Sequence, residues 1–240
     1  MNVDLLAIMA HPDDAELLCG GTLARMAAQG YRVGILDLTS GESGSFGDRD
    51  TRAQEADNAA RVLGVSLRRT ARLPDGALEN TVAARAVVAG FIREMRPRTV
   101  VLHWPEARHP DHAAASHIAR DACFIAGVKN APDIEGETYR PHKLIYALTY
   151  QETHVKPSFV VDVSDYMDKK LEAIFSFGSQ FAQKTRMGDV LGGGSRPLRE
   201  QILAHHAHYG SLIRKEYGEP FWVKETIEIG DVVEMSVNSM

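Results

Sequence analysis

Apolar and polar residues alternate in blocks along the first half of the chain. Four short apolar runs predict strands: Leu5 to Met9, Val33 to Leu38, a weaker run near Leu67 to Leu73, and Thr99 to His103. The amphipathic stretches that separate or follow these runs predict helices over Ala15 to Gln29, Thr51 to Leu63, Ala83 to Met95, and Ala113 to Ala126. Strands that alternate with helices are typical of a parallel sheet with crossover helices.

The second half adds further elements to the same pattern. It predicts strands near Lys143 to Tyr150 and Ser158 to Val163, helices near Tyr166 to Phe177 and Pro197 to Tyr209, and a flexible loop at Gly192 to Ser195. We therefore predict an α/β fold, Rossmann-like and doubly wound, with a mostly parallel sheet and helices on both faces. One domain would span residues 1–240, with a core of about 1–127 and a part of about 140–240 that completes the crevice.

The predicted strand order brings two polar loops together. Right-handed crossovers with the order 3-2-1-4 make the first strand a neighbour of the fourth, and ligands bind at such a switch point. The first strand runs into "AHPDDAE" and the fourth into "WPEARHPDH". Both loops are expected to open into one crevice.

Composition excludes several classes of protein. The 27 Lys and Arg and 32 Asp and Glu residues give a net charge of −5, with no basic stripe for nucleic acid. The start "MNVDLLAIMA" lacks a basic leader, and no apolar run reaches the roughly 20 residues of a membrane span. We expect a cytoplasmic protein in which Cys19 and Cys123 are buried thiols.

The two loops hold residues that commonly bind metals. His11 and Asp14 are three residues apart, as are His109 and His112, so each pair can meet at the first turn of a helix. Two imidazoles and one carboxylate suit zinc, and three protein ligands leave a fourth position open for water, as in catalytic sites. Asp13 would then be a spare acid, placed to act as a general base.

Each loop also has a purely structural interpretation. Asp13, Asp14 and Glu16 are acids that a helix N-terminus favours, and "HPDH" suits a proline turn before a capped helix. Two such motifs on the two sides of one predicted switch point favour a shared site instead.

The two motifs together resemble the LmbE-like, or PIG-L, N-acetylglucosaminyl deacetylase superfamily, which carries AHPDD-x-E and HPDH on a Rossmann-like fold. Further segments are similar, in order and spacing, to its bacillithiol-biosynthesis branch: "ILDLTSGESGS", "TRAQEA", "LPDGAL", "RHPDHAAAS", "DACFIAGVKN", "YMDKKLEAI", "SQF" and "YGEPF". The resemblance covers nearly the whole chain.

The resemblance implies a role for each residue of the two motifs. His11, Asp14 and His112 would hold one zinc ion, with ferrous iron as the alternative metal, and Asp13 would activate water. His109 would stabilise the oxyanion or protonate the leaving amine, with Asp111 tuning it. The implied substrate is N-acetylglucosaminyl malate, and the implied assembly is a homo-oligomer, a trimer or hexamer, without a nucleic-acid or membrane partner.

Four residues are candidates for binding the substrate. Arg52 follows the glycine-rich loop "GESGSFGDRD", which could cover the crevice, although Arg52 with Glu55 also suits a surface helix pair. Asp75 and Glu42 match family positions, although Asp75 also suits a type I turn. Arg108 could hold a carboxylate of malate with two hydrogen bonds.

The chain departs from some relatives at one position. Relatives in the mycothiol pathway have a tyrosine where this chain has Ala107. A tyrosine at the oxyanion would have to come from elsewhere, with Tyr209 and Tyr217 as candidates. The histidines of "LAHHAHYG" are expected on a solvated or subunit-contacting face rather than at a second metal site.

Other functions stay open at this point. A nucleotide or sugar binding protein without chemistry would explain the fold but would leave Asp13 without a role. Among enzymes, the alternatives are a deacetylase of another N-acetyl sugar, a thiol-conjugate amidase, and a tailoring deacetylase of secondary metabolism.

Overall fold

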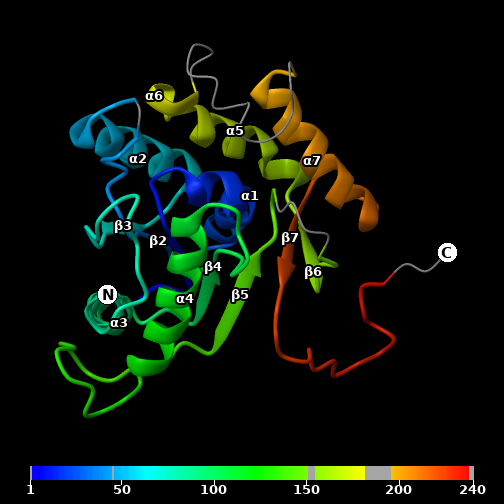
Figure 1. Ribbon diagram of the computed structural model, residues 1–240. Helices are drawn as coiled ribbons and strands as arrows, with labels where there is room; N and C mark the ends of the chain where they lie inside the picture. The colour runs from blue at the N-terminus through cyan, green and yellow to red at the C-terminus, as the bar shows by residue number, and fades with distance from the viewer. Residues whose placement is uncertain (1, 45, 151–154, 182–195, 238–240) are drawn as a thin grey trace.

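The computed structural model describes residues 2–44, 46–150, 155–181 and 196–237. In it a twisted sheet lies between two layers of helices (Figure 1). The strands are β1 (Leu5–Met9), β2 (Val33–Asp37), β3 (Leu67–Thr70), β4 (Thr99–Leu102), β5 (Lys143–Ala147), β6 (Phe159–Asp162) and β7 (Gly218–Trp222). The helices are α1 (Asp14–Ala28), α2 (Arg49–Leu63), α3 (Val82–Met95), α4 (Pro110–Ile125), α5 (Met167–Phe175), α6 (Gly178–Phe181) and α7 (Leu198–Leu212).

The sheet has the order β3-β2-β1-β4-β5-β7-β6, so the predicted order 3-2-1-4 is confirmed. Strands β1 to β5 pair in parallel, whereas β7 runs antiparallel to both of its neighbours. All five residues of β1 and of β2 are buried, as continuous apolar strands between two helical layers require. The predicted α/β class with a mostly parallel sheet is therefore present.

The two faces of the sheet have separate apolar cores. Helices α3 and α4 pack on one face, where Leu6, Ile8, Val88, Ile92 and Ile118 belong to one buried cluster. Helices α1, α2 and α5 cover the other face in a second cluster. A smaller third cluster joins α5 to α7. Because helices cover both faces of the sheet, the loops at the carboxyl ends of its strands are where a site can form.

The structure differs from the predicted elements at a few places. Strand β7 was not expected, because Gly218 and Pro220 are typical of turns. The helix predicted from Tyr166 follows a 3-10 turn, Ser164–Tyr166, and is followed by the short α6. The loop predicted at Gly192 to Ser195 lies outside the described residues.

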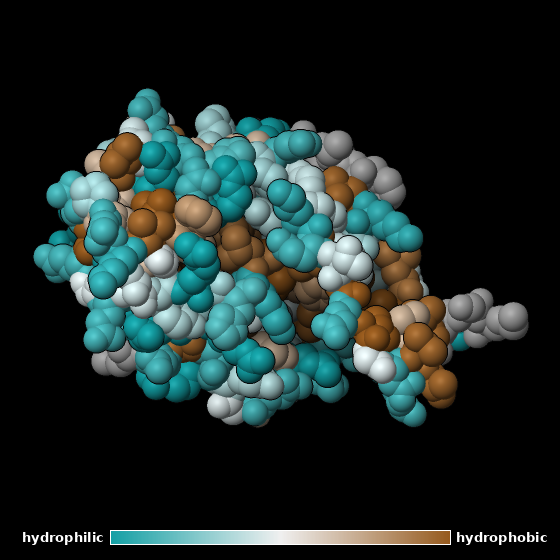
Figure 2. All heavy atoms as spheres, turned by 90° about the horizontal axis from the view of Figure 1, so that it is seen from below, coloured by the Kyte–Doolittle hydropathy of each residue, from teal (hydrophilic) through white to brown (hydrophobic). Residues whose placement is uncertain are grey.

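Other expectations can be compared directly. Cys19 and Cys123 are buried free thiols, as predicted. No helix in the described ranges is long and apolar enough to cross a membrane. After β7 the chain leaves the body as a bent segment without helix or strand (Figure 1), and Figure 2 shows apolar atoms on the part that protrudes. Its exposed apolar side chains are Ile227, Ile229, Val232, Val233, Met235 and Val237. The predicted homo-oligomer stays a prediction.

Candidate metal centre

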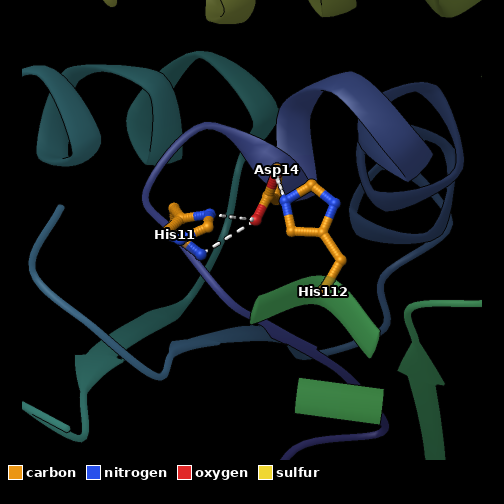
Figure 3. Close-up of side chains that lie close together, drawn as sticks. All are labelled: His11, Asp14 and His112. Carbon is orange, nitrogen blue, oxygen red and sulfur yellow. Dashed lines mark hydrogen bonds and ion pairs between the residues drawn. The ribbon is translucent and has the colours of Figure 1, made fainter. Parts of the chain in front are cut away.

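The two polar loops meet at the carboxyl ends of β1 and β4. These strands pair in register from Leu5 with Thr99 to Ile8 with Leu102, so their following loops start side by side. His11 comes from the loop between β1 and α1, Asp14 is the first residue of α1, and His112 comes from the first turn of α4 (Figure 3). The predicted shared crevice is therefore formed.

The three side chains predicted to hold metal converge. His11 Nδ1 lies 3.3 Å from Asp14 Oδ2, and His112 Nε2 lies 3.2 Å from Asp14 Oδ1. One ligand atom from each residue lies within 4.8 Å of the others. Two imidazoles and a carboxylate this close are a ligand set that fits zinc with a fourth position open.

Two further carboxylates fix the ring of His11. Its Nε2 atom lies 3.1 Å from Asp75 Oδ1 and 3.3 Å from Asp111 Oδ2. Metal-binding imidazoles commonly use their second nitrogen in this way, which orients the ring. Nδ1, on the side of Asp14, is therefore the ligand atom that we assign to His11.

A second possible group consists of His11, His109 and Asp111. The carboxylate of Asp111 already accepts hydrogen bonds from Gly76 N at 2.8 Å and Leu78 N at 3.2 Å. Asp14 Oδ1, in contrast, faces His112. These contacts favour the group that contains Asp14.

His103 also lies at the site, although the sequence pattern placed it only at the end of a strand. Its ring is buried, its Nε2 accepts a hydrogen bond from Ala10 N at 3.0 Å, and it lies 3.4 Å from Asp14 Oδ2. The ring stacks on His112 with 4.3 Å between centroids. Burial and the nearby His112 lower the pKa of His103 to about 4, so the ring is neutral. A neutral ring behind the ligands supports them without adding charge.

Neighbouring charges and hydrogen bonds shift the pKa values of two of these side chains. Burial would raise the pKa of Asp14, but the charge of His112 beside it holds that pKa well below the usual value. Burial would lower the pKa of His11, but hydrogen bonds to Asp14 and Asp75 raise it to about 11. The pocket therefore favours one positive charge among its carboxylates, as a cation site does.

Asp13 lies beside the ligands and is held by Arg52. Its backbone φ is 113°, a positive value that is uncommon for residues other than glycine and marks a constrained turn. Burial raises the pKa of Asp13 to about 8, against the opposing charge of Arg52. Arg52 Nη2 donates to Pro12 O at 2.6 Å and lies 3.4 Å from Asp13 Oδ2.

The alternative interpretation of Arg52 and Glu55 as a surface helix pair is wrong. Both residues are buried, and each bonds elsewhere: Arg52 bonds the loop of Asp13, and Glu55 accepts hydrogen bonds from Ser179 N and Oγ, both at 2.7 Å. The helix face that the sequence suggested for solvent is covered by α6. Arg52 therefore belongs to the site.

His109 begins α4. Its Nδ1 accepts a hydrogen bond from Asp111 N at 3.2 Å, so the proton of the neutral ring is on Nε2. Burial and the nearby His112 lower the pKa of His109, whereas the charge of Asp111 raises it. The carboxylate of Asp111 contacts His11, so its predicted influence on His109 would act through space.

A cavity of about 350 Å³ opens over these residues. The loop at Gly41, Ser43 and Gly44 and the helix residues Gln180 and Phe181 form two of its walls. The site residues that line it are His11, Asp13, Asp14, Arg52, His109 and His112. Asp75 also lines it and accepts a hydrogen bond from Ser43 N at 2.7 Å.

Other candidates lie outside the lining of this cavity. Glu42 is exposed and accepts hydrogen bonds from Ser40 N and Asp75 N, so it braces the wall. Arg108 is exposed on the loop before His109. Tyr209 and Tyr217 also lie outside the lining.

The histidine cluster of α7 differs from its prediction. His206 is fully buried and lies 4.0 Å from Glu219 Oε1, and His205 Nε2 accepts a hydrogen bond from Tyr150 N at 3.0 Å. A solvated face is therefore wrong for these two residues, because α7 packs on α5 and β7. His208 is exposed, as expected. In the described part of the chain, the potential metal groups are the two that contain His11.

Known proteins share this fold and these motifs. A family described as "PIG-L: GlcNAc-PI de-N-acetylase" matches residues 6–123. The conserved protein TT1542 from Thermus thermophilus has a crystal structure with a TM-score of 0.85 and 37% identity, covering 95% of this chain and 98% of that one.

Three relatives show what activities the similar proteins have. A diacetylchitobiose deacetylase of Thermococcus kodakarensis is 33% identical over 75% of this chain and 70% of its own. A 1D-myo-inositol 2-acetamido-2-deoxy-alpha-D-glucopyranoside deacetylase 2 of Catenulispora acidiphila is 32% identical over 58% of this chain and 57% of its own. A Bacillus anthracis protein described as "Probable N-acetyl-alpha-D-glucosaminyl L-malate deacetylase 2" is 28% identical over 75% of this chain and 82% of its own.

The matched family includes both histidine motifs, and the relative from Thermococcus kodakarensis extends the match over three quarters of the chain. The protein therefore belongs to the PIG-L, or LmbE-like, family of deacetylases that act on N-acetylglucosamine-type substrates.

Proposed function

We propose that the protein is a zinc-dependent hydrolase that removes the acetyl group from an N-acetylglucosaminyl conjugate. The observation that carries this proposal is the position of Asp13, a buried carboxylate beside a converged set of metal ligands to which it does not belong. A purely structural metal site has no use for a spare acid, whereas amide hydrolysis requires a base.

The ligand set His11, Asp14 and His112 would hold the ion. When bound, a divalent ion polarises a carbonyl oxygen and lowers the pKa of water toward neutrality. The protein supplies the remaining chemistry, which is to take a proton from water and to give one to the leaving nitrogen.

Asp13 would take the proton from the attacking water. Arg52 fixes the position of Asp13 by bonding both its carboxylate and the carbonyl of the preceding Pro12. This double contact holds the base at the wall of the cavity, where a water molecule can reach it.

His109 would stabilise the oxyanion or protonate the leaving nitrogen of the amide. Its Nδ1 accepts a hydrogen bond from Asp111 N, so the ring proton is on Nε2. From there it can be donated to an oxyanion or to the leaving amine. His109 lines the same cavity as Asp13, so the two groups can act on one substrate.

The finer proposal concerns the substrate. We propose N-acetylglucosaminyl malate, which is supported by the whole-chain resemblance and by the relative from Bacillus anthracis. Arg108 adjoins His109 in the sequence and is exposed, and we propose that its guanidinium binds a carboxylate attached to the sugar. The relatives from Thermococcus and Catenulispora name diacetylchitobiose and an inositol glycoside as the competing substrates.

A direct assay separates these proposals. Amine release is measured from N-acetylglucosaminyl malate, N-acetylglucosaminyl inositol, diacetylchitobiose and free N-acetylglucosamine, with metal-stripped protein and after addition of Zn²⁺. We expect release only with metal, and fastest release from the malate glycoside. A faster reaction on another substrate would replace the malate proposal, and no release from any of the four would favour a binding protein.

A further inference from the structure

Helix α1 is not continuous. Cys19 has φ −146° and ψ 18°, so the helix is broken between a short first segment that starts at Asp14 and a longer second segment. A broken helix leaves carbonyl groups without partners before the break and amide groups without partners after it. Because this break is buried, these carbonyl and amide groups need hydrogen-bond partners from other parts of the fold.

Lys170 from α5 bonds the end of the first segment. Its Nζ donates to Glu16 O at 3.0 Å and to Leu17 O at 2.7 Å. The next carbonyl, Leu18 O, accepts a hydrogen bond from Thr149 Oγ1 at 2.8 Å. A cation at the carbonyl end of a helical segment is also favoured by the helix dipole.

Glu219 from β7 bonds the start of the second segment. Its Oε1 accepts from Gly21 N at 2.9 Å, and its Oε2 accepts from Thr22 N at 2.7 Å. Lys170 Nζ and Glu219 Oε1 lie 2.7 Å apart, and both side chains are fully buried. The ion pair therefore lies in the break: Lys170 bonds the carbonyl groups before it, and Glu219 bonds the amide groups after it.

The glycines at the break lie close to this pair. A Cβ atom at Gly20 would lie 3.4 Å from Lys170 Cγ, and one at Gly21 would lie 3.1 Å from Glu219 Oε1 and 2.8 Å from Val163 Cβ. At Gly21 a larger residue would push Val163 and Glu219 away from the backbone, whereas at Gly20 a Cβ atom would make only an ordinary contact with Lys170. Gly21 therefore fits the close approach of Glu219 to the start of the second segment.

We propose that Lys170 and Glu219 are positioning residues that set the orientation of the first segment of α1, and with it Asp13 and Asp14. The proposal rests on the proposed function, because it assigns to Asp14 a metal that the pair helps to hold. A buried ion pair alone is weak support for stability, since well-packed apolar residues often replace one without loss. Here Lys170 and Glu219 also hydrogen-bond the backbone of α1, the helix that begins with Asp14. We therefore expect their loss to change the affinity of the site for metal.

The test compares two variants of matched kind. Lys170→Met with Glu219→Gln removes both charges at similar volume and leaves no lone buried charge. The control is Arg93→Met, which also removes a buried cation, one that donates to the carbonyls of Ala126, Val128, Ile134 and Gly136 on the other face of the sheet. Zn²⁺ affinity is measured by competition with a chromogenic chelator, independently of deacetylation.

We expect the double variant to bind Zn²⁺ at least about 10-fold more weakly, as loss of supporting groups around metal ligands does, and Arg93→Met to stay within about twofold of wild type. Equal affinities in the double variant and wild type would overturn the proposal. So would an equal loss in both variants, because it would follow from general destabilisation.

Amide exchange of the metal-free wild-type protein gives a second readout that depends neither on metal nor on any variant folding. We expect the amides of Gly21 and Thr22 to be protected like that of Leu23, which lies inside the second segment. Exchange as fast as in the exposed loop at 129–130 would contradict the capping by Glu219. If these amides are protected and Zn²⁺ affinity responds as expected while no acetyl group is released, the proposed function fails and the positioning role stands.

Discussion

Replacing His103 by phenylalanine isolates one hydrogen bond behind the metal ligands. The ring is 1% exposed, accepts the amide proton of Ala10, and stacks on His112. Phenylalanine keeps an aromatic ring of similar size for the stack, but it has no acceptor. Ala10 N, on a residue with no exposed surface, then loses its partner. Leaving a buried donor unsatisfied costs about 1 to 3 kcal/mol.

Urea unfolding followed by circular dichroism measures this cost. With a slope of about 3 kcal/mol/M, we expect the midpoint of His103→Phe to fall by about 0.3 to 1 M, with the slope unchanged. His103→Gln is the control, because its amide oxygen can accept the same proton, and we expect it to recover part of the loss. A His103→Phe variant as stable as wild type would show that this hydrogen bond does not stabilise the fold, as would a His103→Gln variant that is less stable than His103→Phe.

Three further substitutions test separate parts of the account. We expect Asp13→Asn to keep its zinc and to lower kcat by a factor of about 100 or more, as loss of a general base does; loss of zinc, with activity restored by added Zn²⁺, would make Asp13 a ligand. Arg108→Ala is expected to lower kcat/KM for N-acetylglucosaminyl malate by about 10- to 150-fold, the equivalent of about 1.5 to 3 kcal/mol, without affecting free N-acetylglucosamine; equal loss on both substrates would indicate a structural role. Arg68→Met leaves the buried carboxylates of Asp37 and Glu16 without their cation and is expected to lower the free energy of unfolding by about 3 to 5 kcal/mol, with the more exposed Arg69→Met within about 0.5 kcal/mol of wild type; similar unfolding free energies for the two variants would contradict this.

The fold was predictable where local pattern decides it. The continuous apolar runs of β1 and β2, with amphipathic helices between them, are typical of parallel strands, and the usual handedness of crossovers gave the order of the first four. Strand β7 could not be found in this way. Pro220 has no amide proton for a ladder, but its carbonyl accepts a hydrogen bond from Leu148 N, so the strand tolerates it.

The candidate site was predictable where residues follow a strand directly. His11 and Asp14 after β1, and His112 after β4, are brought together by the pairing of these two strands. His103 could not be assigned, because a single histidine at the end of an apolar run gives no sign of its partners.

The supporting residues depend on contacts between distant parts of the chain. Lys170 lies in a stretch that reads as an ordinary amphipathic helix, and its partner Glu219 lies in the strand that was not expected. Only the antiparallel placement of β7 beside β5 and β6 brings the two together behind α1. No local sequence pattern contains that information.

Metal analysis of the purified protein tests whether His11, Asp14 and His112 hold a metal ion. Zinc content per chain is measured in wild type, in His11→Ala with His112→Ala, and in His142→Ala with His208→Ala, two exposed histidines outside the site. We expect about one zinc per chain in wild type and in the variant of the exposed pair, and almost none when His11 and His112 are lost. A stoichiometric metal that survives the loss of His11 and His112 would contradict this expectation.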